Sequence, residues 1–346
     1  INKSSDYFNT KLYTGTGSTR SVTGVGFKPD FVWIKNRVKA DSNHFLLDIV
    51  RGATKYLHSD ADSSETTNTN TLTSFDSDGF SLGDLDNVNK NNDTLVSWNW
   101  LAGGGQGSAN TAGGINSTVS VNTTSGFSIV KYTGNGSLGS TVGHGLSAVP
   151  QVIITKRLTS TDDWIVQHHQ ITTGNPWDDL YCVLNTTAGR AGSYSVSGGY
   201  TPTSSLIYLG NDGRVNGNGQ DYISYVFAGK TGYSKFGSYT GNGSSDGTFC
   251  YTGMKPSFVM VKKTSAANNF VITDNKRDSF NDDATEYLLA NDSGVAGTGL
   301  NFDLLSNGFK LKSNSGGTNT SGATYIYMAF AEAPLVGSNN VPCTAR

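Results

Sequence analysis

The chain repeats itself three times, and this repetition constrains its fold more than any other feature of the sequence. The segment YTGTGS at 13–18 recurs as YTGNGS at 132–137 and again at 239–244. Each copy is followed by a proline that opens a β-branched or aromatic run ending in a lysine, at 29–35, 150–156 and 256–262. Self-similarity at a long, regular interval indicates one structural unit present in three copies.

The far end of each unit repeats as well, at 95–100 (LVSWNW), 222–227 (YISYVF) and 325–330 (YIYMAF). In the first of these, Val96, Trp98 and Trp100 alternate with Ser97 and Asn99. Because side chains alternate across a strand, this spacing places the three large apolar residues on one face. We expect that face to be core and the opposite face to lie outside it.

Turn signals between these strands predict hairpins. Asp-Gly and Asn-Gly steps occur at 78–79, 212–213 and 307–308, and they supply the positive φ angles that tight hairpins require. Helical periodicity is limited to 45–57 and 282–289, which are too short to organise a fold. The sequence therefore predicts an all-β chain of three tandem antiparallel β-sandwich domains, of a jelly-roll or lectin-like kind.

The repeats also predict domain boundaries. The three sandwiches are expected at 1–103, 126–229 and 230–335, with a C-terminal tail at 336–346. The segment 104–125 is rich in Gly, Ser, Thr and Asn, which predicts a flexible linker, although 118–121 would also serve as an edge strand of the second unit.

Composition excludes several partners. The net charge of −2 leaves no basic stripe to neutralise nucleic-acid phosphates, and no run of apolar residues is long enough to insert into a membrane. Cys182, Cys250 and Cys343 are too scattered for a disulfide framework or a zinc site, so we interpret them as two core residues and one tail residue. No cofactor is predicted.

Three stretches carry a resemblance to a known family: 26–37 (GFKPDFVWIKNR), 141–146 (TVGHGL) and 325–332 (YIYMAFAE). They resemble a repeat family of virion-associated proteins, of the tail-fibre or appendage type, in tailed bacteriophages, especially those of marine bacteria and cyanobacteria. The resemblance implies a place on the virion surface, other virion proteins as partners, and the C-terminal portion of a longer phage protein. Fibres in general suggest a homotrimer, whereas three tandem units would also give a monomer of pseudo-threefold shape. The resemblance brings no catalytic residues.

Catalysis has weak candidates in this sequence, and we predict that the protein is not an enzyme. His168 and His169 lie near an aspartate pair at 178–179, but neighbouring residues in a strand point to opposite faces. Aspartate pairs at 162–163, 178–179 and 282–283 keep a polysaccharide-degrading enzyme as an alternative, because glycoside cleavage uses two carboxyl groups across one sugar.

Glycan binding has a broader basis, because sugars are held by aromatic faces together with carboxylate or amide groups. The candidate residues lie in the second unit and are Trp164, Trp177, Asp178, Asp179, Tyr194 and Tyr200. The same residue types also build the core and turns of an all-β chain. A weaker hypothesis is calcium binding by Asp76, Asp78, Asp84 and Asp86, although Asx turns explain the same residues and the EF-hand spacing is missing.

These observations favour a virion structural or appendage protein that contacts the host surface or virion partners non-covalently, with glycans as one candidate ligand. Loops at the ends of a sandwich suit this task because they vary without disturbing the core. The alternatives are a purely architectural decoration or connector protein and, less favoured, the polysaccharide-degrading enzyme.

Overall fold

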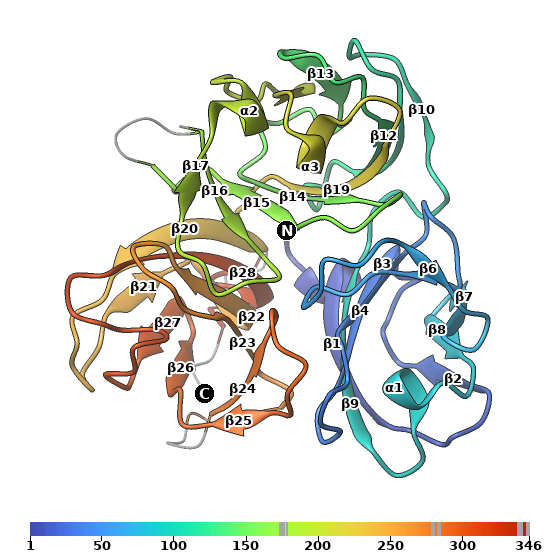
Figure 1. Cartoon of the computed structure of the whole chain (residues 1–346). Coiled ribbons are helices and arrows are strands. Elements are labelled where there is room, and N and C mark those ends of the chain that lie inside the picture. The colour runs from blue at the N-terminus through green and yellow to red at the C-terminus, as the bar shows by residue number, and fades with distance from the viewer. Residues whose placement is uncertain (173–176, 178, 278–280, 282–284, 338–341, 344–346) are drawn as a thin grey trace.

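The computed structural model describes the chain from residue 1 to 346 apart from 173–176, 178, 278–280, 282–284, 338–341 and 344–346. It is an all-β protein built of three lobes that surround a common centre (Figure 1). Lobe 1 runs from η1 to β9, lobe 2 from β10 to β19, and lobe 3 from β20 to β28. The fold class predicted from the repeats is therefore confirmed.

The elements of lobe 1 are η1 (Ser4–Asp6), β1 (Phe8–Thr14), β2 (Arg20–Thr23), β3 (Phe31–Asn36), β4 (Phe45–Asp48), β5 (Lys55–Tyr56), β6 (Thr66–Thr67), β7 (Leu72–Asp76), β8 (Gly79–Leu82), α1 (Asp86–Asn89) and β9 (Thr94–Trp100). Those of lobe 2 are β10 (Ser108–Asn110), β11 (Ser117–Asn122), β12 (Phe127–Thr133), β13 (Ser140–Gly143), β14 (Val152–Arg157), β15 (Ile165–His168), β16 (Leu180–Val183), β17 (Ala191–Gly192), α2 (Tyr194–Ser197), β18 (Leu206–Leu209), α3 (Gly213–Asn216) and β19 (Asp221–Phe227). Those of lobe 3 are β20 (Ser234–Thr240), β21 (Phe249–Tyr251), β22 (Met254–Lys263), β23 (Phe270–Asp274), β24 (Glu286–Leu289), β25 (Gly297–Thr298), β26 (Phe302–Leu305), β27 (Gly308–Leu311) and β28 (Thr324–Pro334).

Each lobe contains a main antiparallel sheet and a small one. The main sheets have the orders β1-β9-β3-β4, β10-β11-β12-β19-β14-β15-β16-β17 and β20-β28-β22-β23-β24-β25. The small sheets are β2-β8-β7, β13-β18 and β21-β27-β26. In lobe 2 the segment 117–122 forms β11, which pairs with β12 from Phe127 to Tyr132, and β10 pairs on its other side as the edge strand, so this part of the expected linker belongs to the sheet.

The three main sheets share one apolar core at the centre of the molecule. One face of each central strand points into this core, where Phe31 of lobe 1, Tyr225 of lobe 2 and Phe258 of lobe 3 lie among the buried residues. The Phe31 and Tyr225 rings stack with their centroids 4.2 Å apart. The opposite face of each main sheet packs on the small sheet of its own lobe in a separate cluster. Each lobe is thus a β-sandwich whose main sheet uses the face away from its small sheet to pack against the main sheets of the other two lobes.

This arrangement corrects two sequence expectations. Ser97 and Asn99 were expected outside the core, yet both are fully buried, because β9 is covered by the small sheet on one side and by the other lobes on the opposite side. The helical expectation for 45–57 is also wrong: β4, a turn and β5 occupy this stretch. In the second helical candidate, 286–289 forms β24, and 282–284 lies outside the described residues.

In each lobe, hydrogen bonds from one buried asparagine hold the repeated YTGxGS segment in place, and we call this set of bonds the asparagine lock. In lobe 2 the amide of buried Asn216 accepts a hydrogen bond from the Asn135 backbone N–H at 2.9 Å and donates to the carbonyl oxygens of Ser137 at 2.9 Å and Gly210 at 2.7 Å. The first glycine, Gly134, has no room for a Cβ, which would lie 2.6 Å from the carbonyl oxygen of Gly217. Asn89 and Asn319 make the corresponding bonds in lobes 1 and 3.

A buried lysine joins each lobe to a neighbour. Lys35, Lys156 and Lys262 occupy the same position on β3, β14 and β22 and are buried. Their ammonium groups donate across the lobe boundary to the carbonyl oxygens of Ser293 at 2.9 Å, Asp62 at 3.0 Å and Thr187 at 3.1 Å, respectively. Burial lowers the pKa of each lysine to about 8. The three contacts close the lobes into a ring.

Candidate functional site

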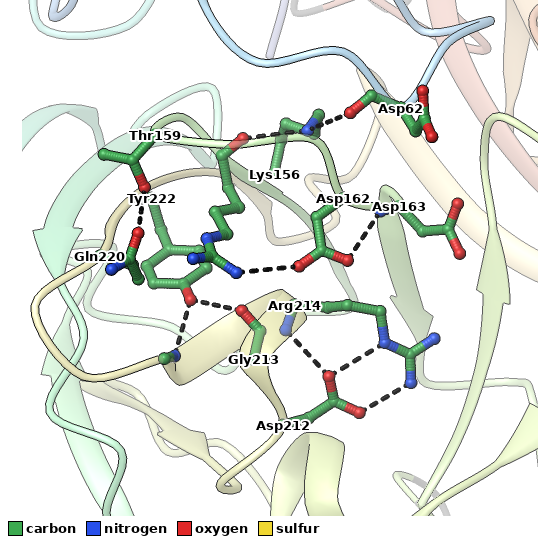
Figure 2. A network of polar contacts seen from close by, with 12 residues as sticks. Asp62, Lys156, Thr159, Asp162, Asp163, Asp212, Gly213, Arg214, Gln220 and Tyr222 are labelled. Carbon is green, nitrogen blue, oxygen red and sulfur yellow. Dashed lines mark hydrogen bonds and ion pairs between the residues drawn. The ribbon is translucent and has the colours of Figure 1, made fainter.

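The boundary between lobes 1 and 2 carries a polar network, shown in Figure 2, that accounts for one aspartate pair of the sequence analysis. Asp162 accepts from the Arg157 guanidinium at 3.4 Å, and its backbone N–H donates to the Asp62 carbonyl oxygen at 2.8 Å. Asp163 accepts at 2.8 Å from the amide of Asn185. The same region contains the Arg214–Asp212 ion pair of α3, at 2.7 Å. Both carboxylates of 162–163 therefore have structural partners that fix the loop after β14.

The two tryptophans expected to hold a glycan do not present their faces to solvent. Trp164 is 0 % exposed in the central core, and its indole N–H donates to the His58 carbonyl oxygen of lobe 1 at 2.8 Å. Trp177 is buried against the small sheet of lobe 2. Trp164 is buried by the core that the three lobes share, which a free-standing sandwich would not have, whereas Trp177 is buried within lobe 2 itself. Asp178 lies outside the described residues.

The two tyrosines expected at the same site are exposed and lie together at the outer end of lobe 2. Tyr194 and Tyr200 are 57 % and 44 % exposed. The Tyr200 ring stacks on Tyr208 of β18, with centroids 5.1 Å apart and an interplanar angle of 26°. Leu138, 47 % exposed, adds an apolar side chain beside them. We call these four residues the tyrosine cluster.

Two glycines bring the rings of the cluster together. Gly198 ends α2 at φ 70° and Gly199 follows at φ 75°, a left-handed pair that non-glycine residues seldom adopt. A Cβ at Gly199 would lie 2.8 Å from the Tyr194 ring, and one at Gly198 would lie 3.0 Å from Leu138. The close packing of the aromatic rings on the backbone therefore requires both glycines.

Asp179 adds a carboxylate to the edge of the tyrosine cluster. One of its oxygens, Oδ1, accepts from the Ser197 hydroxyl at 2.5 Å and from the Gly199 backbone N–H at 2.7 Å. Among the described residues, no group donates a hydrogen bond to Oδ2 of Asp179. The hydroxyls of Tyr194 and Tyr200 likewise have no hydrogen-bond partner among the described residues. The carboxylate is thus held in place with one oxygen left to accept from a ligand.

Sequence reasoning missed Tyr208 and Leu138. Tyr208 lies on β18, whose burial alternates between buried Ile207 and Leu209 and the more exposed Leu206 and Tyr208, but its sequence LIYL is apolar throughout and does not show this alternation. Leu138 carried no signal either, since it lies in the loop after the second YTGNGS copy.

The four aspartates of the calcium hypothesis do not converge. Asp76 accepts from the hydroxyls of Ser74 and Ser81, both at 2.7 Å. Asp78 accepts from the backbone N–H groups of Gly24 and Gly26, which hold its pKa below the usual value. Asp84 and Asp86 are exposed at α1. Across the described residues, no group of three His, Cys, Asp or Glu side chains is arranged to hold a metal ion.

The two histidines face the same neighbour instead of opposite sides. His168 ends β15 and the chain turns at once, so both rings reach lobe 3: His168 contacts the Tyr327 carbonyl oxygen at 3.2 Å and His169 that of Phe236 at 3.1 Å. Burial lowers the pKa of His168 to about 3. A role in joining lobes explains both residues.

Cys182 and Cys250 are buried and Cys343 is partly buried, and all three are free thiols. In the described part of the chain, no helix is long and apolar enough to cross a membrane.

A family model described as a domain of unknown function (DUF7483) matches residues 3–334 of the chain. The match spans all three lobes, so the model describes the threefold unit as a whole. No curated protein matches the chain, and no solved structure matches it.

Proposed function

The chain belongs to the DUF7483 family, and we propose that it is a virion structural or appendage protein of a tailed bacteriophage that binds host-surface glycans non-covalently. The phage setting rests on the resemblance of 26–37, 141–146 and 325–332. The binding role rests on the geometry of lobe 2.

The observation that carries the binding role is the tyrosine cluster. Tyr194 and Tyr200 expose amphipathic rings whose hydroxyls lack partners among the described residues. Aromatic faces of this kind cover the C–H surface of a sugar, and their hydroxyls bond to its polar groups. Asp179 supplies a fixed acceptor beside the rings. The site needs little reordering on binding, because the two glycines and the Tyr200–Tyr208 stack already set its shape.

Multivalency would add to a weak single site. Several chains on one particle would each present a tyrosine cluster to the same surface, so the bond to the surface would be stronger than any single contact. Within the described part of one chain only lobe 2 has this cluster, because Ser81 of β8 in lobe 1 and Lys310 of β27 in lobe 3 stand at the position that Tyr208 occupies on β18.

The test uses an array of bacterial surface polysaccharides and the intact purified protein. The Tyr194→Ala/Tyr200→Ala variant should lose the signals that the wild type gives. Val149→Ala removes a 48 % exposed apolar residue of the same lobe and should keep them. If the double variant keeps full binding while its circular dichroism spectrum is unchanged, the cluster is not the glycan site. The virion setting is tested separately, by labelling intact phage particles with an antibody raised against the protein; unlabelled particles would contradict it.

A purely architectural role is the second candidate, and a pair on lobe 3 favours it. Phe249 and Tyr251 are 44 % and 59 % exposed on the same side of β21. Phe249 offers no hydrogen-bonding group, which suits a protein partner better than a sugar. Under this alternative, Phe249→Ser/Tyr251→Ser would reduce the incorporation of the chain into particles, while the tyrosine-cluster variant would not.

A further inference from the structure

A polar pocket of about 350 Å³ lies between lobes 2 and 3. Lobe 2 contributes Gln170, Thr172 and Arg190, and lobe 3 contributes Ser238, Thr240 and Thr324 from the ends of β20 and β28. The pocket is separate from the tyrosine cluster, with which it shares no residue. Its volume lies at the lower end of the range of about 300 to 1,000 Å³ for small-molecule sites.

Arg190 has a structural counterpart in each of the other lobes. Its backbone N–H donates across the lobe boundary to the Thr264 carbonyl oxygen at 2.8 Å. Glu65 does the same toward Leu158 at 3.0 Å, and Ala296 toward Arg37 at 2.8 Å. The same backbone contact therefore occurs at all three boundaries, and it needs no particular side chain.

The side chains at these three positions differ in charge and in whether that charge has an ion-pair partner. The Glu65 carboxylate is neutralised within its own lobe by Lys55 at 3.1 Å and Arg51 at 3.5 Å. Ala296 carries no charge. The Arg190 side chain is on an exposed residue that lines the pocket, and its guanidinium has no ion pair and no hydrogen bond with any described residue. Of the three positions, only the one between lobes 2 and 3 therefore holds a charge without compensation from the described residues.

The rest of the pocket suits a ligand with hydroxyl groups. Arg190 supplies the only formal charge among the lining side chains, and no carboxylate among them faces it. The hydroxyls of Ser238, Thr240 and Thr324 are on exposed residues and able both to donate and to accept. That of Thr324 also shares a hydrogen bond with the Thr264 hydroxyl at 2.9 Å. Ser238 also donates to the Gln170 amide oxygen at 3.2 Å, which links the two lobes at the pocket.

We propose that this pocket binds a carboxylate-bearing sugar, such as a uronic acid. The planar guanidinium of Arg190 matches a carboxylate through two parallel hydrogen bonds, which gives both affinity and orientation. The hydroxyls of Ser238, Thr240 and Thr324 then bond to the hydroxyls of the ring. The inference is independent of the proposed glycan site, because it uses other residues in another part of the molecule.

The experiment is a calorimetric titration of the full chain with glucuronic acid at pH 7, with glucose and sulfate as comparison ligands. Glucuronic acid should bind, glucose should bind at least about tenfold more weakly because it lacks the carboxylate, and sulfate should bind no better than glucose. Arg190→Gln should weaken glucuronic acid binding by about tenfold or more. Lys276→Gln, which removes a positive charge from an exposed residue of lobe 3 outside the pocket, should leave the affinity unchanged.

Three outcomes would overturn the proposal: no binding of glucuronic acid at millimolar concentrations, equal binding of sulfate, or an Arg190→Gln variant with wild-type affinity. Thr240→Val gives a second test that leaves the charge in place. It should weaken glucuronic acid binding severalfold without changing the unfolding midpoint, because Thr240 is an exposed residue. The Tyr194→Ala/Tyr200→Ala variant should bind glucuronic acid as the wild type does, so failure of either site can be told from failure of the other.

Discussion

Replacing Asp274 by asparagine would test whether the lobes are joined through buried charge. Asp274 ends β23 and is fully buried, and its carboxylate accepts from the Arg277 guanidinium Nε at 2.6 Å. It also accepts from the indole N–H of Trp98, in lobe 1, at 3.1 Å. The side chains of both ion-pair partners are 0 % exposed.

The magnitude follows from what the substitution leaves behind. An asparagine at this position would carry no charge, so the guanidinium of Arg277 would stay buried with the Ile272 carbonyl oxygen at 3.0 Å and no counter-ion. Removing one partner of a buried pair costs about 3 to 5 kcal/mol. At about 2.1 cal/mol/K of unfolding entropy per residue, a chain of this length would lose about 4 to 7 °C in its unfolding midpoint.

The assay is thermal unfolding followed by calorimetry and by tryptophan fluorescence. Asp246→Asn is the matched control, because Asp246 pairs with Lys310 at the surface and its side chain is 84 % exposed, so its midpoint should not move. Adding Arg277→Met to Asp274→Asn should restore much of the lost stability, since no charge is then left buried. A single variant that unfolds within about 1 °C of the wild type, with no effect of the second substitution, would show that the buried Asp274–Arg277 pair does not stabilise the protein in this way.

Four further predictions follow from the same structure. Lys156→Met should cost only about 1 to 2 kcal/mol at pH 7, because the loss of two charge-assisted hydrogen bonds is partly offset by removing a buried charge. Burial lowers the pKa of Lys156 to about 8, so between about pH 8 and 10.4 the unfolded chain binds more protons at this residue than the folded chain does. The stability of the wild type should therefore rise relative to that of the variant across this window. A stability difference that does not change with pH would contradict the burial of this charge. Asn216→Ala should lower the free energy of unfolding by about 3 kcal/mol in chemical denaturation, because it removes three hydrogen bonds of a buried side chain. Asn218→Ala, at an exposed residue, should change the free energy of unfolding little. Equal effects of the two substitutions would contradict the role of the asparagine lock. Stability should fall as the pH drops from 6.5 toward 3, because burial lowers the pKa of all five histidines and the unfolded state therefore binds more protons than the folded state. Asp30 and Asp60, whose pKa values are raised to about 6, oppose this loss only in part. Urea titrations that show equal stability at pH 7 and 4.5 would contradict this prediction. Light scattering should return the 36.6 kDa of one chain, because three lobes already surround the common core, and three times that mass would favour the homotrimer instead.

Fold class was accessible from the sequence because its signals are local and occur three times. The closing strands β9, β19 and β28 lie where the repeated aromatic runs predicted them. The Asp-Gly and Asn-Gly steps at 78–79 and 307–308 join β7 to β8 and β26 to β27 as hairpins, whereas the hairpin predicted at 212–213 is wrong, because Asp212 caps α3 and Gly213 begins it. Each of these features depends on neighbours within a few residues along the chain.

The merging of the lobes was not accessible, because it depends on contacts between residues far apart in sequence. Trp164 looks like a ligand-binding residue in the sequence, yet it contacts lobe 1 through a bond to His58. The repeated lysine at 35, 156 and 262 was visible as a pattern, but a lysine at the end of a strand normally points to water. Only the neighbouring lobe reveals that each one is buried and bonded to a carbonyl oxygen.

Only part of the candidate site could be predicted from the sequence. Tyr194 and Tyr200 were identified because aromatic residues in loops suit sugar binding, and the structure places them together with Tyr208. The remaining candidates lay close in sequence but in different layers of the fold, since Trp164 belongs to the central core and Trp177 to the cluster beneath the small sheet. Nearness along the chain does not distinguish these layers.

Hydrogen–deuterium exchange of the intact protein, with and without a polysaccharide that it binds on the array, tests most directly where the glycan binds. Binding at the tyrosine cluster should slow exchange at 194–200 and 206–209, which carry its three tyrosines, and leave β21 of lobe 3 unchanged. Protection that appears at β21 and not at 194–200 would contradict it, because the glycan would then bind through Phe249 and Tyr251 instead of through lobe 2.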